Sequence, residues 1–311
     1  MSWDKKNIDK LVELRLDGYT WDDISEALYK VNKLEVSANN CRKAFYRNTR
    51  DNAEVTPVKV LILDIETAPL VGYVWSLWDQ NVALNQIVHD WSILSWSAKW
   101  LGSDKVIYMD TRNEKDPRND KKILQGIWNL MDEADVILGQ NSKSFDVKKL
   151  NTRFILNGMK PPSSFRQIDT MRLAKKHFSF TSNKLEYLTK KLCVENKKSS
   201  HKKFGGFELW KECLAGNLEA WKEMEMYNIT DILSTEELYH KLKSWDSSIN
   251  FNVYHDAFHS QCSCGSTDYK KHGFVYSNAG KFRRNICVKC GAESVDKENL
   301  LIKEKRKSLR K

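Results

Sequence analysis

Two carboxylates at the end of a hydrophobic segment are the first residues of this sequence that could do chemistry. Residues 58–63 are aliphatic apart from one lysine, which predicts a strand buried on both faces of a sheet. Asp64 and Glu66 follow, and residues two apart in an extended chain leave the same face. Neighbouring carboxylates repel each other and are costly to desolvate unless a cation lies between them. We therefore interpret Asp64 and Glu66 as half of a divalent-metal site rather than as a solvated strand end.

Further acids follow at two predicted helices. Asp146 comes after a predicted strand at 135–138, in the first turn of a helix that Ser144 can cap. The helix dipole favours a negative charge there, which would explain Asp146 without any ligand role. Tyr227 and Asp231 lie on a long helix predicted from 217 to about 242, where residues four apart share a face. Taken alone, that pair is typical of an ordinary helix surface.

The elements that must position these residues form an α/β domain. After the first strand, residues 73–78, 91–101 and 105–110 are predicted to be strands that add to the sheet in antiparallel order. Residues 121–133 form an amphipathic helix, and the helix after Asp146 buries Val147, Leu150, Phe154 and Ile155. Ser182 is expected to cap a later helix. The tryptophans of this region are interpreted as core residues rather than as platforms for stacked bases, with the alternative that one or two of them near the acids serve a single strand.

The order of these motifs carries a resemblance to a known family. The motifs are Asp64-x-Glu66, Asn141-x3-Phe145-Asp146 and Tyr227-x3-Asp231. Over residues 57–245 the chain resembles the DEDD superfamily of 3′–5′ exonucleases, in the subclass that uses tyrosine. Segments 169–178 and 182–188 look like exonuclease domains found in phage and in family-B-polymerase-like proteins. Gln140 departs from the pattern, because many relatives carry histidine before the asparagine, but it is not expected to touch the acids.

The resemblance implies a ribonuclease H-like fold, in which a mixed sheet is flanked by helices. It also implies hydrolysis of phosphodiesters to nucleotide 5′-monophosphates with two Mg²⁺ or Mn²⁺ ions, which hard oxygen ligands suit. Tyr227 would position the attacking water. The residues that would hold the ions are Asp64, Glu66, Asp146 and Asp231.

Residues 1–50 are predicted to form three helices. Gly18 ends the first, Thr20 caps the second with Asp23 as a capping box, and Ser37 caps the third. Because the third helix carries Arg42, Lys43 and Arg47, the module resembles a helix-turn-helix whose third helix reads the major groove. The connection at 30–36 is longer than the standard turn, so a plain three-helix or protein-interaction domain remains the alternative. Residues 51–57 are expected to be a linker.

Four of the seven cysteines lie close together near the end of the chain. Cys262, Cys264, Cys287 and Cys290 predict a zinc ribbon over residues 255–298 that binds one Zn²⁺. The first pair is separated by one residue instead of two, so His255 or His259 could replace Cys262. A segment with so few aliphatic residues could hardly fold without metal, and the alternative is four free thiols in a disordered tail.

Basic residues surround these modules. Within 274–284, aromatic and basic residues interleave, a pattern suited to single-stranded nucleic acid or to the ribbon's own small core. Another basic stretch, residues 197–203, is either a solvated loop or a grip on backbone phosphates. Residues 299–311 form a basic tail. The net charge of +10 over 311 residues agrees with a polyanionic partner such as nucleic acid.

The sequence has no run of 18 apolar residues and no signal-peptide pattern, so we expect no membrane partner and a reducing cytoplasm. The prediction is a metal-dependent 3′–5′ exonuclease with two accessory nucleic-acid-binding modules, acting on DNA rather than RNA, beside replication or recombination proteins. The alternatives are a DNA-binding regulator or recombination accessory protein with a nuclease-like fold, and an RNA-trimming exonuclease. Complete acid and tyrosine motifs argue against the regulator, because a degenerate nuclease usually loses one.

Overall fold

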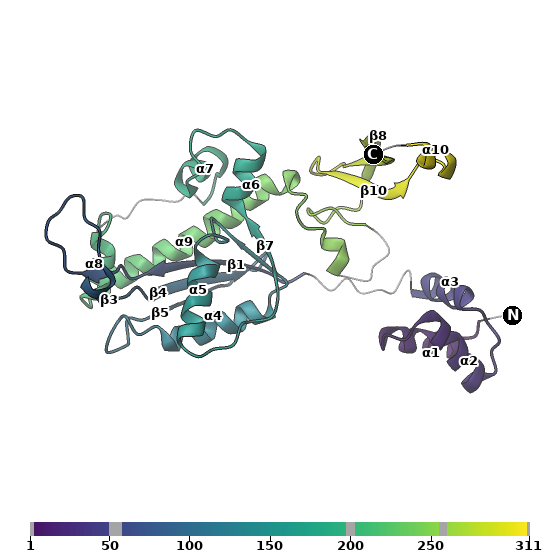
Figure 1. The fold of residues 1–311 in the computed structure, drawn as a ribbon, viewed down its shortest axis with the longest axis horizontal. Helices are drawn as coiled ribbons and strands as arrows, with labels where there is room; N and C mark the ends of the chain where they lie inside the picture. Colours follow the sequence, from purple (N-terminus) through teal and green to yellow (C-terminus); the bar gives the residue numbers. More distant parts are fainter. Residues whose placement is uncertain (1–2, 50–57, 197–202, 255–259, 310–311) are drawn as a thin grey trace. The chain divides into compact units, whose positions relative to one another are not determined.

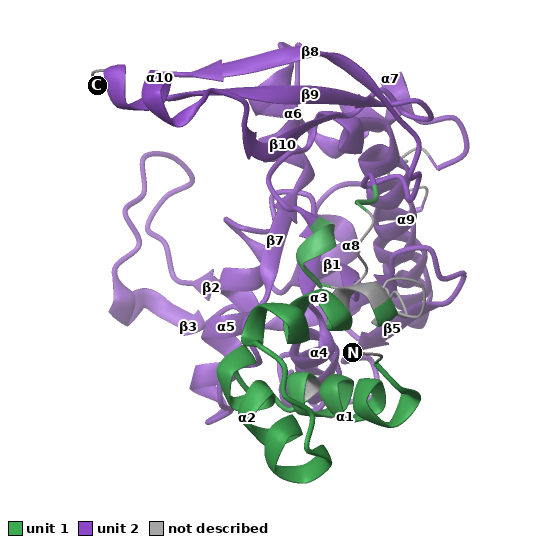
Figure 2. Cartoon of the chain, turned by 90° about the vertical axis from the view of Figure 1, so that its right-hand side faces the viewer, with its two compact units in different colours: residues 1–57, 251–261 green, residues 58–250, 262–311 purple. Residues whose placement is uncertain are grey.

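The protein is described from a computed structural model, which covers residues 3–49, 58–196, 203–254 and 260–309. Its contacts divide the chain into two units, coloured separately in Figure 2. One unit contains residues 1–57 and 251–261, and the other contains residues 58–250 and 262–311. The predicted linker at 51–57, most of the basic stretch at 197–203, and both His255 and His259 lie outside the described residues.

The first unit contains the three helices that the sequence predicts. They are α1 (Lys5–Leu16), α2 (Trp21–Asn32) and α3 (Ala38–Thr49), followed in the same unit by the 3-10 turn η3 (Phe251–Tyr254). Thr20 and Asp23 form the predicted capping box, and the Ser37 hydroxyl accepts from the Asn40 amide at 3.3 Å. A small apolar core holds the helices together through Leu11, Leu14, Ile24, Leu28, Cys41 and Ala44.

The second unit contains the predicted mixed sheet, so the predicted α/β fold is confirmed (Figure 1). Its described strands stand in the order β5-β4-β1-β6-β7. The two pairs β1–β4 and β4–β5 are antiparallel, whereas β1–β6 and β6–β7 are parallel. The strand bounds are β1 (Val60–Thr67), β4 (Ile93–Trp100), β5 (Val106–Asp110), β6 (Val136–Gly139) and β7 (Arg166–Asp169).

Helices pack on both faces of this sheet. Leu61, Leu63 and Ile65 of β1 point to one face, where they join a core with α4 (Lys121–Glu133) and α5 (Asp146–Leu156). Gly126 allows α4 to approach closely, because a Cβ there would lie 2.8 Å from the Trp96 ring. The long helix α9 (Leu218–Leu242) packs on the other face against β1 and β4. Around α9 stand α6 (Thr170–His177), α7 (Leu185–Leu192) and α8 (Glu208–Leu214).

The predicted strand at 73–78 is wrong. The described ladder there is limited to β2 (Val71–Gly72) and β3 (Ile87–His89), with the 3-10 turn η1 (Leu84–Gln86) before β3. The aromatic and aliphatic residues of this segment fit a strand, but residues 73–78 have no partner strand in the described ladders. Trp75 is 95% exposed and Trp78 is 80% exposed. These two tryptophans therefore do not fill the core, whereas Trp96 and Trp221 do.

Two predicted helix caps are also wrong. Helix α5 begins at Asp146 with Phe145 as the N-cap residue, while the Ser144 hydroxyl instead accepts from Arg172 Nη2 at 3.0 Å. Helix α7 has Lys184 as its N-cap residue. The Ser182 hydroxyl accepts from the Lys184 amide just before the helix and so does not cap it. Ile155, predicted to be buried, is 75% exposed.

The C-terminal part of the described chain forms a separate three-stranded sheet, in the order β10-β9-β8. Its strands are β8 (Tyr269–Ser277), β9 (Gly280–Cys287) and β10 (Glu293–Asn299), and the short helix α10 (Lys303–Ser308) follows within the predicted basic tail. The turn η2 (Lys243–Trp245) ends α9. None of the described helices combines the length and the apolar character that crossing a membrane would require.

A buried ion pair fixes the helices to the sheet. The Asp120 carboxylate accepts from Arg153 Nε at 2.6 Å, from Arg153 Nη2 at 2.8 Å and from the Ile93 amide at 2.9 Å. Asp120 precedes α4, Arg153 lies in α5 and Ile93 begins β4. Only 1% of the Asp120 side chain is exposed, so this pair joins three elements in a region from which water is excluded.

We predict that Arg153→Met lowers the free energy of unfolding of this domain by about 3–5 kcal/mol, because Asp120 then remains buried without its cation. Urea denaturation measures the change. The control is Lys211→Met, which removes a solvent-exposed pair with Glu208 and should cost about 0–1 kcal/mol. Equal, small effects of the two substitutions would contradict the structural role of Asp120.

Candidate active site

Strand β1 presents the first two acids to the face that α9 covers. Asp64 pairs across the sheet with Ser97, and Glu66 pairs with Ser95. Directly paired residues of antiparallel strands share a face, so small polar side chains stand beside both acids. Ile65, between them, points into the core on the opposite face. The strand's alternation thus separates an acidic surface from an apolar one.

Asp231 approaches this acidic surface from α9. Asp64, Glu66 and Asp231 each place one carboxylate oxygen within 4.8 Å of the other two. Asp231 is only 3% exposed. The long helix begins where the sequence predicts it, and the Asn217 side chain caps α9 by accepting from the Glu219 amide at 3.0 Å. The structure therefore brings three of the four predicted acids together, which we name the acid cluster.

Asp146 lies beside this cluster rather than within it. Its Oδ1 accepts from the Ile65 amide at 3.1 Å, so the carboxylate contacts β1 between Asp64 and Glu66. Burial raises the pKa of the Asp146 carboxyl to about 7, and the charges of Asp169 and Asp231 act in the same direction. A nearby cation would keep this carboxylate ionised at neutral pH.

Tyr227 stands one helical turn before Asp231 on α9 and is partly exposed. Its ring packs edge-to-face on Trp210 of α8, with ring centroids 6.2 Å apart. Helix α8 was not predicted, although Leu209 and Cys213 are spaced four apart and are both buried. That spacing was the available signal for the helix that supports Tyr227.

Asn228 is a site residue that the sequence analysis missed. It is fully buried, and its Nδ2 donates to Asp64 Oδ2 at 2.6 Å. Its Oδ1 accepts from the Ser95 hydroxyl at 3.2 Å. Asn228 therefore ties α9 to both β1 and β4 and fixes the orientation of the Asp64 carboxylate. The available signal was its spacing, because Asn228 lies four residues after Met224 and four before Ile232, which are apolar positions of the same predicted helix.

Asp169 is a second residue whose role the motifs do not reveal, although it begins one of the two segments that look like exonuclease domains. Its carboxylate accepts from the Asn141 amide at 3.1 Å and from the Lys143 amide at 3.3 Å. These bonds hold the loop that leads to Asp146, in which Asn141 has a φ of +62°. Gln140 contacts Asn183 and Thr170, as expected for a residue that does not touch the acids.

The acid cluster fits a divalent cation by its chemistry. Its donors are carboxylate oxygens, which hard ions such as Mg²⁺ and Mn²⁺ prefer. Packing three carboxylates within 4.8 Å is unfavourable without positive charge between them. Asp64, Glu66 and Asp231 could hold such an ion, and Asp146 is close enough to share its field.

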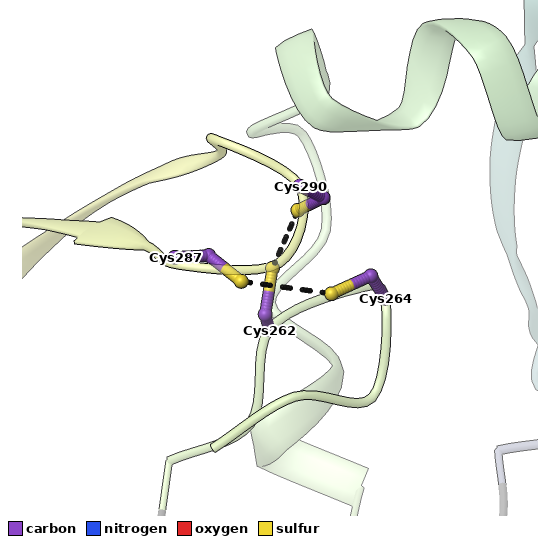
Figure 3. Close-up of side chains that lie close together, drawn as sticks. All are labelled: Cys262, Cys264, Cys287 and Cys290. Atoms are coloured by element: carbon purple, nitrogen blue, oxygen red, sulfur yellow. Dashed lines mark hydrogen bonds between the residues drawn. The ribbon is translucent and has the colours of Figure 1, made fainter. Parts of the chain in front are cut away.

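A second candidate metal site lies in the ribbon, where the four cysteines point toward one another (Figure 3). The Sγ atoms of Cys262 and Cys290 are 3.4 Å apart, and those of Cys264 and Cys287 are 3.6 Å apart. Tetrahedral zinc with Zn–S bonds near 2.3 Å would place its sulfurs about 3.8 Å apart. The short first knuckle therefore still brings Cys262 into the cluster.

Backbone amides of the second knuckle lower the pKa of the Cys287 and Cys290 thiols, whereas burial raises the pKa of the Cys262 and Cys264 thiols. Gly265 and Gly291 have φ values of +84° and +75°, and their amides donate to the carbonyls of Cys262 and Cys287. Burial tends to raise the pKa of the Cys287 thiol, but the amides of Cys290 and Lys289, together with neighbouring thiols, lower it to about 6. A thiolate is the form that binds zinc.

Comparison with known proteins agrees with this fold. Residues 93–243 match the model of the RNase_H superfamily, so the expected ribonuclease H-like fold is confirmed. This range includes Asp146, Tyr227 and Asp231 but begins after β1. The match supports nuclease activity and a nucleic-acid substrate in general terms.

Among solved structures, the chain is similar to the family B DNA polymerase from the hyperthermophilic archaeon Pyrobaculum calidifontis. The identity is 16% and the TM-score is 0.44, and the match covers 60% of this chain and 25% of the polymerase. The matched region is thus a quarter of that polymerase. No curated protein matches the sequence.

We predict that Asn228→Ala weakens Mn²⁺ binding about 10- to 100-fold, because residues that orient a ligand typically contribute that much to metal affinity. Isothermal calorimetry measures the affinity, and circular dichroism checks the fold. The control is Asn129→Ala, an exposed position on α4, which should leave binding unchanged. If both variants bind Mn²⁺ like the parent protein, Asn228 does not orient Asp64 for a metal.

We further predict that the purified protein contains one Zn²⁺ per chain and that Cys290→Ser loses it, because three thiolates hold the ion less tightly than four. Elemental analysis gives the zinc content. Val288→Ser, a 65% exposed position on the same knuckle, should retain the metal. Freshly prepared protein without zinc would show that the cysteines serve another purpose.

Proposed function

We propose that the protein is a metal-dependent 3′–5′ exonuclease that hydrolyses nucleic acid, with DNA as the preferred substrate, to 5′-mononucleotides. The observation that carries the proposal is the acid cluster: Asp64, Glu66 and Asp231 come from distant parts of the sequence, yet their oxygens lie within 4.8 Å. The spacing and order of these residues are those of the DEDD motifs. The ribonuclease H-like fold of the domain supports the same conclusion.

In this proposal each residue has a separate task. Asp64, Glu66 and Asp231 hold the divalent ions, and Asp146 provides a fourth carboxylate from the start of α5. Two bound Mg²⁺ or Mn²⁺ ions would stabilise the charge on the attacking and leaving oxygens of the phosphodiester. The Tyr227 hydroxyl positions the attacking water, and its ring is supported by Trp210.

Exposed aromatic residues favour a single-stranded substrate. The segment between Thr67 and Ile93 leaves the acidic end of β1 and returns at the start of β4. It carries Trp75 and Trp78, which are almost fully exposed. Unpaired bases stack on such rings, whereas the bases of a duplex are already stacked on each other.

The flanking modules are proposed to assist binding. Residues 1–50 are assigned as a helix-turn-helix-like module, with Arg42 and Lys43 exposed on α3, followed by the nuclease domain at 57–245. A zinc ribbon at 255–298 and a basic tail at 299–311 follow the nuclease domain. We propose a replication or recombination protein as a partner and the cytoplasm as the location.

We predict that Asp231→Asn reduces hydrolysis nearly to background, because the amide loses the charge that holds the ion. Tyr227→Phe should reduce the rate about 10²–10³-fold, as expected when one well-placed hydrogen bond is removed. The two variants should differ in metal affinity, since only Asp231 is a ligand. Digestion of an end-labelled single strand gives the rates, and calorimetry with Mn²⁺ gives the affinities.

The matched control is Thr230→Val on α9, whose hydroxyl donates to the Met226 carbonyl of the same helix. It should cleave at the parent rate. If Asp231→Asn digests the strand as fast as the parent, the metal assignment fails. The alternative of a DNA-binding regulator with a nuclease-like fold would then be favoured. Running labelled DNA and RNA in parallel distinguishes the proposed substrate from the RNA-trimming alternative.

We also predict that deleting residues 1–50 weakens duplex DNA binding and flattens its salt dependence. Each lost phosphate contact lowers the slope of log K against log salt by about 0.9. Cleavage of short single strands should persist. An unchanged slope would instead favour the three-helix module as a protein-interaction domain.

A further inference from the structure

One face of the ribbon combines aromatic and basic side chains. In the β8–β9 ladder, Phe274 pairs with Arg283, and Tyr276 pairs with Lys281. Paired residues, and residues two apart on one strand, point to the same face of a sheet. All four side chains therefore share one surface, which we name the ribbon face.

On the ribbon face the cations lie over aromatic rings. Lys281 Nζ is 3.9 Å from the centre of the Phe274 ring and 5.9 Å from that of Tyr276. The Arg283 guanidinium carbon is 5.9 Å from the Phe274 centre. Within the described part of the chain, neither Lys281 nor Arg283 forms a salt bridge. Both positive charges thus remain available to an anion.

The opposite face of the same strands differs. Arg284 is the next residue along β9. Its Nη1 forms an ion pair with Glu293 Oε2 at 3.5 Å, and its Nε donates to the His272 carbonyl at 2.7 Å. Its positive charge is therefore matched within the ribbon. Arg283 therefore lies on the face that could receive a ligand, whereas Arg284 lies on the face whose contacts are made within the ribbon.

The aromatic residues of the ribbon face are not part of the ribbon's described core. That core consists of buried Cys262, Cys287 and Ala292, with Tyr269 and the other two cysteines packed against it. Tyr276 is 69% exposed and Phe274 is 38% exposed. Burial in the ribbon thus does not account for these rings, and adjacent exposed aromatic residues are typical of binding surfaces.

We propose that the ribbon face binds single-stranded nucleic acid. Bases stack on Phe274 and Tyr276, while Lys281 and Arg283 contact the phosphates that flank those bases. Residues 269–292 include no aspartate or glutamate, so the surface complements a polyanion. A duplex would satisfy the cations but would offer the rings no unstacked base. This binding does not depend on whether the acid cluster is catalytic.

The test measures the affinity of the full chain for labelled oligothymidylate by fluorescence anisotropy, without added divalent cation. Replacing both rings, by Phe274→Ala with Tyr276→Ala, should weaken binding at least about tenfold. Replacing both cations, by Lys281→Gln with Arg283→Gln, should lower the salt slope by about 1.4, or roughly 0.7 per charge. The variant that lacks both cations keeps both rings. Its salt slope therefore tests the ribbon face even if the variant that lacks the rings loses its zinc.

The matched control is Lys270→Gln. Lys270 is the register partner of Ile286. Because Ile286 is three residues after Arg283 on β9, Lys270 and Ile286 lie on the face opposite the ribbon face. It should leave the affinity within about twofold of the parent. Parent-like affinity and salt slope in both double variants would overturn the proposal, as would an equal loss in Lys270→Gln. An equal loss for duplex DNA would overturn the assignment to single strands. Because binding is measured, an inactive acid cluster would not affect the result.

Discussion

Repulsion among closely packed carboxylates is the constraint on which this structure depends. Asp64, Glu66 and Asp231 place oxygens within 4.8 Å of one another, and burial raises the pKa of nearby Asp146. Such an arrangement lowers stability unless something compensates for it. A divalent cation would supply that compensation and would also stabilise the charge that develops in phosphodiester hydrolysis. The same electrostatic cost thus explains both why the acids converge and what they could do.

The rest of the domain holds these acids in place. Asn228 joins Asp64 to β4 through Ser95, and Asp169 holds the loop before Asp146. Gly139 allows this loop to pass close to β1, because a Cβ there would lie 3.0 Å from the Leu63 carbonyl oxygen and 2.7 Å from Ser142 Cβ. Polar side chains and a close backbone approach therefore preorganise the site before any ion binds.

Much of this arrangement could be predicted from sequence because it depends on local periodicity. The buried strand before Asp64, helix α4 and the start of α9 near Asn217 all follow from short-range patterns. The exposure of Trp75 and Trp78 could not be predicted, since the aromatic and aliphatic residues around them also fit a strand. Only tertiary pairing decides whether such a segment becomes a strand or an exposed loop. Asn228 and Asp169 were missed for a related reason: their roles arise from contacts with residues distant in sequence.

The central claim is that the acid cluster removes nucleotides from 3′ ends. Its most direct test is a time course with a single strand labelled at its 5′ end, in the presence of Mg²⁺, resolved by length. We expect a ladder that shortens one nucleotide at a time and keeps the label on the longer fragments until late. Immediate release of labelled mononucleotide, internal cuts, or an intact strand would contradict it.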